Sequence, residues 1–300
     1  METVTLGLEW FLNPDHIPFY VADERGYYAD EGLELEVWEP PEHYETLEML
    51  AAGELDFAIT EPIHLIPERA AGVPVRGIAE FLDTPGGIQY PTNRGWETPA
   101  NLPDDVRLNY PGAPEPEGRR MVAAMIQHAG GDHSADDIEP VDRGFYHTDA
   151  LIEDDADIAF LAFHNFEVVE SRHREFDTAL WELDDYGLPD FSRLILTASD
   201  ETLDTAPDRV EKFVRATRRG VETTLAEPET AIDTFCERNP AVREDDPALL
   251  DAIASDTVER FTADFSQATG MYADLAEFAV EIGLADEPVP VSAVADERFA

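Results

Sequence analysis

The chain has 300 residues, of which 43% are hydrophobic, and this is enough apolar material for the core of one or two folded domains. Its formal net charge is −46, Lys212 is its only lysine and basic patches are missing, so nucleic acid and anionic membranes are poor partners. Cys236 is the only cysteine, which excludes an internal disulfide and a thiolate metal cluster.

The acidic residues are spread along a chain whose apolar content is ordinary. This distribution predicts a folded protein with an acidic shell, typical of halophilic proteins from a high-salt cytoplasm. The first residues lack a charged segment, an apolar segment and a lipobox cysteine, so no export signal is recognised. The sequence as given therefore predicts a cytoplasmic protein, or an extracellular, membrane-associated one if a signal has been trimmed.

The first elements along the chain form a predicted βαβ unit. Apolar residues alternate from Val4 to Trp10, which predicts a strand. Pro18 suits the first position of a helix that ends at Gly26. A second strand alternates from Leu33 to Val37. The turn after the first strand is the place where open α/β sheets bind ligands.

Two later segments share one pattern, TLEMLAAGELDFAITE at 46–61 and TDALIEDDADIAFLA at 148–162. Each predicts a short helix, a tight polar turn and an apolar strand that is entered through an aspartate, Asp56 or Asp157. A repeat of this supersecondary unit suggests two similar lobes.

The remaining segments divide the chain between these lobes. The Gly- and Pro-rich segment 83–103 predicts a loop that crosses into the second lobe, and a strand at 194–197 predicts the return. The predicted lobes are residues 1–88 with 194–300, and residues 89–193. The other predicted elements are a strand from Val106, a helix at 119–129, and helices at 207–226, 228–238, 246–262 and 271–283.

Several motifs together resemble the thiamine-pyrimidine superfamily, which has the type II periplasmic-binding-protein fold. They are GLEW, PDHIPFYVA, RGYY, GLELEV, LAAGELDFAITEPIHL, AGVPVRGIAEFLD, LNYPG and the stretch from DDYGLPDF to RATRRG. The resemblance covers roughly residues 4–240 and implies a two-lobed α/β fold with a ligand cleft between the lobes. It also implies hinge closure over a small aromatic heterocycle.

The resemblance includes two branches with different functions. One branch comprises solute-binding proteins that deliver formylaminopyrimidine thiamine precursors to an ABC transporter. The other comprises hydroxymethylpyrimidine phosphate synthases, which use pyridoxal phosphate, iron and a histidine of their own chain. His64 matches that histidine, but Thr60 stands where the synthases have a lysine, and their cysteine cluster and glycine-rich phosphate loop are not matched.

Candidate ligand-binding residues follow the predicted strands. Trp10 could stack on a flat ring, and the amide of Asn13 could donate and accept at a ring edge, although a core tryptophan and a turn asparagine are the plainer interpretations. His16 and His64 could hydrogen-bond the ligand, together with Glu61. Their spacing has no metal signature, so no metal site is predicted.

The second lobe supplies the other candidates. Glu61 and Glu167 stand at corresponding ends of the two repeats, where a carboxylate can accept from an exocyclic amine or a protonated ring nitrogen. The remaining predicted contacts are Tyr110, Gly112, Asp185 and Tyr186.

The sequence therefore predicts a solute-binding protein for an aminopyrimidine thiamine precursor, without a cofactor or a catalytic residue and with an ABC permease as its partner. The alternative is a cytoplasmic synthase that uses pyridoxal phosphate, iron and His64. A ligand-sensing regulatory protein, or a related binding protein for a taurine-like or riboflavin-like solute, stays open.

Overall fold

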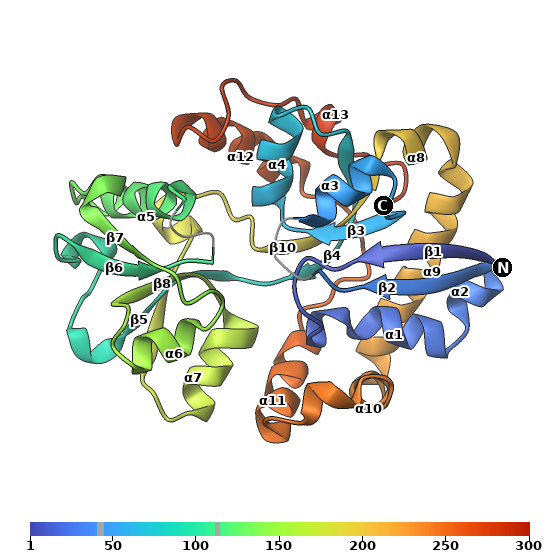
Figure 1. Ribbon diagram of the computed structural model, residues 1–300, viewed down its shortest axis with the longest axis horizontal. Helices are drawn as coiled ribbons and strands as arrows, with labels where there is room; N and C mark the ends of the chain where they lie inside the picture. The colour runs from blue at the N-terminus through green and yellow to red at the C-terminus, as the bar shows by residue number, and fades with distance from the viewer. Residues whose placement is uncertain (41–44, 112–114) are drawn as a thin grey trace. The chain divides into compact units, whose positions relative to one another are not determined.

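A computed structural model describes residues 1–40, 45–111 and 115–300 (Figure 1). The chain divides into two compact units, unit 1 with residues 1–83, 191–280 and 285–300, and unit 2 with residues 84–190 and 281–284. The boundaries expected from the sequence, 88/89 and 193/194, lie a few residues away because a strand inside the expected crossing loop belongs to unit 2.

Unit 1 is built on a five-stranded sheet in the order β2-β1-β3-β10-β4. The first three strands are parallel, and β10 runs antiparallel to both β3 and β4. The strands are β1 (Glu2–Gly7), β2 (Leu33–Trp38), β3 (Phe57–Thr60), β4 (Val75–Asp83) and β10 (Arg193–Ser199).

Unit 2 contains a second five-stranded sheet in the order β7-β6-β8-β5-β9. Again three strands are parallel, and β5 runs antiparallel to β8 and β9. The strands are β5 (Gly86–Pro91), β6 (Val106–Asn109), β7 (Ile138–Val141), β8 (Ile158–Phe163) and β9 (Thr178–Glu182). The two sheets thus have the same strand arrangement, and an α/β fold with two sheets is confirmed.

Helices cover both faces of each sheet (Figure 1). Those of unit 1 are α1 (Ile17–Glu24), α2 (Tyr27–Asp30), α3 (Glu45–Ala52), α4 (Pro62–Ala70), α8 (Asp200–Thr205), α9 (Pro207–Ala226), α10 (Pro228–Arg238), α11 (Pro247–Val258), α12 (Thr269–Glu281) and α13 (Val291–Val294). Those of unit 2 are α5 (Glu117–His128), α6 (His147–Ile152) and α7 (Val169–His173). None of the described helices is long and apolar enough to cross a bilayer.

The core of unit 1 is formed where α9 packs on α1 and on the sheet. The rings of Phe57 in β3 and Phe213 in α9 stack with centroids 3.9 Å apart. The buried hydroxyls of Tyr28 and Thr217 are hydrogen-bonded at 2.8 Å. Gly220 permits the close helix contact, because a Cβ there would lie 2.3 Å from the carbonyl oxygen of Pro18. These contacts fix the position of β1, and with it the turn that follows.

The aspartate that enters the third parallel strand has the same structural role in both units. In unit 1, Asp56 Oδ2 accepts a hydrogen bond from the Thr5 amide of β1 at 2.9 Å. In unit 2, Asp157 Oδ2 accepts from the Arg107 amide of β6 at 3.1 Å. The strand registers also correspond, with Leu6 opposite Phe57 and Leu108 opposite Ile158. The repeat found in the sequence is therefore a repeat of structure.

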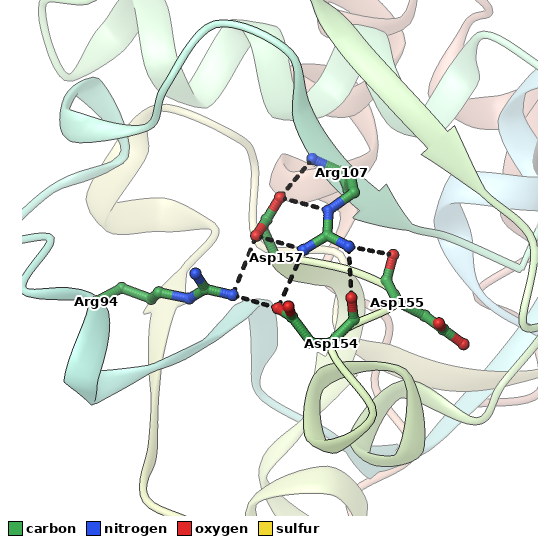
Figure 2. Close-up of polar contacts among 5 residues, drawn as sticks. All are labelled: Arg94, Arg107, Asp154, Asp155 and Asp157. Carbon is green, nitrogen blue, oxygen red and sulfur yellow. Dashed lines mark hydrogen bonds and ion pairs between the residues drawn. The ribbon is translucent and has the colours of Figure 1, made fainter.

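In both units this aspartate also pairs with an arginine. Asp56 lies 3.1 Å from Arg209, and in unit 2 Asp157 belongs to a larger ion-pair network (Figure 2). The guanidinium of Arg107 contacts both carboxylate oxygens of Asp157 at 2.9 Å, and Arg94 lies 3.2 Å from the same side chain. Asp154 accepts from both arginines. Because the Asp157 side chain is only 14% exposed and that of Arg107 29%, this pair is better shielded from water than an ordinary surface ion pair.

We expect Asp157→Ala to lower the free energy of unfolding by roughly 2–4 kcal/mol, because it leaves the Arg107 amide and guanidinium without their shared acceptor. Burial raises the pKa of Asp157, but the hydrogen bonds and charge of Arg107 outweigh it, and the pKa is lowered. The contribution is therefore complete above the unfolded pKa, about 3.9, and is lost as the pH falls through the folded value. Urea unfolding of wild type and variant at several pH values measures the difference.

The control for this prediction is Asp104→Ala, whose side chain is 99% exposed and should change stability by less than about 0.5 kcal/mol. An equal effect of the two substitutions, or a difference between wild type and Asp157→Ala that does not shrink in acid, would contradict this role.

Candidate functional site

The turn after β1 presents two aromatic side chains at the carboxyl end of the strand. The strand ends at Gly7, three residues earlier than the alternation of the sequence suggests, so Trp10 lies in the turn. Trp10 is half-buried and Phe11 is 47% exposed, with ring centroids 4.1 Å apart and planes at 54°. The Leu12 amide donates to Glu39 at 3.0 Å, which ties the turn to the end of β2. The structure thus leaves aromatic surface open where a flat ligand could stack.

Buried polar side chains of this turn are hydrogen-bonded to its own backbone. Asn13 Oδ1 accepts from the Asp15 amide at 2.8 Å, and Asn13 Nδ2 donates to the Phe11 carbonyl at 3.0 Å. His16 has no exposed surface; its Nδ1 accepts from the Asn13 amide at 3.1 Å, and its Nε2 lies 3.1 Å from both carboxylate oxygens of Glu9. The amide donor at Nδ1 places the proton of neutral His16 on Nε2, which donates to Glu9.

The electrostatics of His16 follow from this arrangement. Burial lowers the pKa of His16, but the charge and hydrogen bond of Glu9, the charge of Asp15 and the hydrogen bond with Asn13 together outweigh it, so the pKa lies above its ordinary value. The side chains of Asn13 and His16 therefore form the turn, and a direct contact of either with a ligand stays a prediction. Glu9 is a participant that the sequence did not reveal, since an acid seven residues before a histidine has no recognised signature.

A second histidine pair follows β3. Glu61 is the residue before α4, and its Oε2 lies 2.8 Å from His64 Nδ1, with side chains 16% and 13% exposed. Pro62 at the first helical position starts α4 directly after the strand, which brings the two side chains together one turn apart. Both predicted residues therefore lie at the carboxyl edge of the sheet of unit 1.

The predicted residues after β6 are only partly described. Tyr110 is 4% exposed, and its ring packs against α5 at Gly118, where a Cβ would lie 2.5 Å from the ring. Gly112 lies outside the described residues. Tyr110 is thus mainly a packing residue here, and its contact with a ligand stays a prediction.

Glu167 is buried in a π-helical turn, His164–Val168, directly after β8. Its Oε2 accepts from the Phe163 amide at 2.7 Å. The strand register pairs Phe57 with Leu6 and Ile158 with Leu108, so the residue corresponding to Glu61 is Ala162 and not Glu167. The two glutamates therefore do not correspond, because an extra π turn follows β8.

Asp185 and Tyr186 form a short 3-10 helix, Asp184–Tyr186, after β9. Asp185 is exposed, whereas the Tyr186 ring packs edge-on against Trp181 with centroids 6.4 Å apart. Trp181 in turn stacks on Tyr90 at 3.9 Å. Tyr186 therefore belongs to an aromatic cluster of unit 2, and the sequence did not place Tyr90 or Trp181 in it.

Within the described ranges, no group of three or more His, Cys, Asp or Glu side chains is arranged to hold a metal ion. A ligand cleft shared by the two units stays a prediction.

Comparison with known proteins identifies the family to which the chain belongs. A family model described as NMT1/THI5 like matches residues 13–231, which is more than half of the chain. The chain is 26% identical over 236 residues to a formylaminopyrimidine-binding protein of Halalkalibacterium halodurans, covering 78% of this chain and 70% of the relative. It is 28% identical over 303 residues to a 4-amino-5-hydroxymethyl-2-methylpyrimidine phosphate synthase of Legionella pneumophila, covering 99% and 92%.

Solved structures show the same fold at low sequence identity. The periplasmic aliphatic sulphonate binding protein SsuA of Escherichia coli superposes with a TM-score of 0.73 at 14% identity, covering 99% of this chain and 92% of that one. The alkanesulfonate-binding protein SsuA of Xanthomonas axonopodis, bound to MOPS, gives 0.71 at 15% identity and covers 98% of each chain. The predicted periplasmic-binding-protein fold is thereby confirmed.

Proposed function

We propose that this chain, which belongs to the NMT1/THI5-like family, is a solute-binding protein for an aminopyrimidine precursor of thiamine. The observation that carries the proposal is the half-buried Trp10 at the carboxyl end of β1, held by a turn whose buried polar groups are already paired. A rigid aromatic face at a strand end is suited to stacking on a flat heterocycle. The formylaminopyrimidine-binding relative supports this class of ligand.

The second candidate is a pyrimidine synthase, and the match to the Legionella synthase over 99% of this chain favours it. The residues do not fit its cofactor. Thr60, in the place of the synthase lysine, is 4% exposed at the end of β3 and has no amine to bind an aldehyde. His64 has Glu61 as its close acidic neighbour, and the described residues offer no three-ligand metal site for iron.

The only lysine of the chain, Lys212, lies in the first turns of α9. Glu31, before the amino end of β2, has its pKa lowered first by a hydrogen bond from Arg215 and also by the charge of Lys212. His64 follows the carboxyl end of β3, and β1 pairs in parallel with both β2 and β3. The charge effect on Glu31, although the smallest of those acting on it, thus supports a position of Lys212 away from a cofactor beside His64.

An ABC permease as the partner, and a location outside the cell membrane, belong to the same proposal. The synthase alternative would act in the cytoplasm. Detection of the native chain in washed membrane or culture fractions, and not in the cytosol, separates the two locations.

We expect Trp10→Ala to weaken binding of formylaminopyrimidine roughly 10- to 100-fold, about 1.4–2.8 kcal/mol, because the stacking face is lost. Wild-type affinity should be about micromolar, near −8 kcal/mol. Titration in molar salt, followed by calorimetry and by a saturable change in tryptophan emission, measures both quantities.

The matched control is Trp96→Ala, which removes a half-buried tryptophan of unit 2 that lies beside Arg94. It should leave the affinity unchanged. Binding that is equally strong in Trp10→Ala and wild type removes Trp10 from the site.

A further inference from the structure

One buried histidine of unit 2 has a ring nitrogen without a hydrogen-bond partner in the described part of the chain. His147, the first residue of α6, is 1% exposed, and its Nε2 has no hydrogen-bond partner among the described residues. The next residue, Thr148, is fully buried and its Oγ is also without a partner in the described part of the chain. Buried polar atoms without partners are uncommon in native proteins and require an explanation.

The side chain of Asn109 determines which ring nitrogen carries the proton. Asn109 Oδ1 accepts from the Arg143 amide at 2.9 Å, which fixes the orientation of the side-chain amide. Its Nδ2 then donates to the Gly144 carbonyl at 3.0 Å and to His147 Nδ1 at 2.9 Å. Because Nδ1 accepts, neutral His147 carries its proton on Nε2.

His147 is neutral at ordinary pH. Burial lowers the pKa of His147 to about 3, and no charged neighbour contributes to the shift. The site thus offers an uncharged N–H donor in surroundings without a compensating charge, where a charged ligand group would be costly to bury. A neutral acceptor is the matching chemistry.

The position of His147 connects it to the expected ligand region of unit 2. Asn109 is the last residue of β6, and ligands of open α/β sheets bind outside the carboxyl ends of the strands. The two nitrogens of an imidazole point in diverging directions, so the Nε2–H of His147 is directed away from Asn109. In unit 1 the hydroxyl of Thr46, which corresponds to Thr148 in the repeat, instead donates to the Leu8 carbonyl at 2.9 Å. Unit 2 therefore differs from the repeat in unit 1, because the Thr148 hydroxyl has no partner among the described residues.

We propose that His147 Nε2–H donates a hydrogen bond to an uncharged carbonyl oxygen of the bound ligand. This inference rests on the proposed function, and in formylaminopyrimidine the formyl oxygen is the acceptor of this kind. His147 thereby distinguishes a formylated ligand from the corresponding free amine.

The test compares two ligands and three forms of the protein. Formylaminopyrimidine and the same aminopyrimidine without its formyl group are titrated into wild type, His147→Phe and His147→Gln. We expect His147→Phe to weaken the formylated ligand about tenfold, or about 1.4 kcal/mol, and to leave the affinity for the free amine nearly unchanged. His147→Gln, which retains an N–H donor, should recover most of the loss, and the exposed His173→Gln should have no effect.

Nitrogen-15 NMR of the His147 ring provides a readout that does not depend on affinity. The formylated ligand, and not the free amine, should shift the Nε2–H proton resonance. The inference is overturned if His147→Phe weakens the binding of both ligands equally. It is also overturned if the Nε2–H proton shows contact with an internal water and its resonance does not change when the formylated ligand is added. If wild type binds neither ligand, the proposed function fails; if it binds both with no dependence on His147, only this inference fails.

Discussion

Transfer of the protein from molar to millimolar potassium chloride is expected to lower its melting temperature by roughly 10 °C or more, on the order of 4 kcal/mol of stability. The chain carries 66 acidic and 20 basic residues, so at least 46 carboxylates stay without a basic partner even if every base pairs once. The Debye length grows from about 3 Å at 1 M to about 30 Å at 0.01 M salt, and the repulsion among these carboxylates grows with it. Calorimetry over a series of salt concentrations measures the change.

The structure indicates which acidic side chains are neutralised by an arginine and which repel one another at low salt. Arginines of α9 are paired with the neighbouring acids of unit 1, as Arg215 is with Glu31 at 2.7 Å and Arg219 with Asp30 at 3.1 Å. Such ion pairs involve the few basic side chains of the protein, so many acidic side chains have no basic partner. Glu34 and Glu36 are both exposed on one face of the edge strand β2, two residues apart.

This pair provides a matched test of the cause. Glu34→Lys combined with Glu36→Lys should raise the melting temperature more in millimolar than in molar salt, because the gain is electrostatic. Sucrose, which strengthens burial without screening charge, should not replace the salt. A melting temperature that is independent of salt, or one restored by sucrose alone, would rule out the acidic-shell interpretation.

The parts of the fold that the sequence predicted are those with local signals. The helices expected at 207–226 and 228–238 are α9 and α10 with the same limits, because Pro207 and Pro228 each take a first helical position and start the helix there. The aspartates before β3 and β8 were recognisable since the repeat places them before an apolar strand.

The segment 83–103 shows why the rest was not predictable. It was expected to be a loop because it is rich in Gly and Pro, yet it contains β5, which pairs with β8 and β9 far along the chain. The glycines serve strand packing there: a Cβ on Gly87 would lie 2.0 Å from the Trp181 carbonyl oxygen. Pairing over such sequence separations leaves no local pattern in a short segment.

Some residues of the candidate site were also predictable from the sequence, and others were not. Trp10, Glu61 and His64 lie at strand ends as the motifs indicated. The roles of Asn13 and His16 were not evident, because whether a polar side chain faces a ligand or caps its own turn depends on φ/ψ angles and burial that the residue type does not specify. Glu9 and Asn109 were missed for the same reason, since each acts through a partner found only in the folded chain.

The last prediction separates a binding protein from a synthase. When the protein is incubated with pyridoxal phosphate and ferrous iron in air, we expect no pyrimidine product, no loss of mass at His64 and no Schiff-base absorbance from the site. The synthases use a lysine beside the reacting histidine, and here that place is taken by Thr60 while the only lysine, Lys212, lies in α9. Absorbance and intact-protein mass spectrometry follow the reaction.

The control for this experiment is Lys212→Arg, which retains the positive charge beside Glu31 and removes the only side-chain amine of the chain. Weak Schiff-base absorbance in wild type that disappears in Lys212→Arg is a surface adduct, and the same sample should still bind preformed formylaminopyrimidine. Formation of one equivalent of pyrimidine together with mass loss at His64 would instead establish the synthase. If Lys212→Arg also forms this product, the chemistry proceeds without a lysine. In that case the pair of His64 and Glu61, 2.8 Å apart at the carboxyl end of β3, is where the reaction takes place.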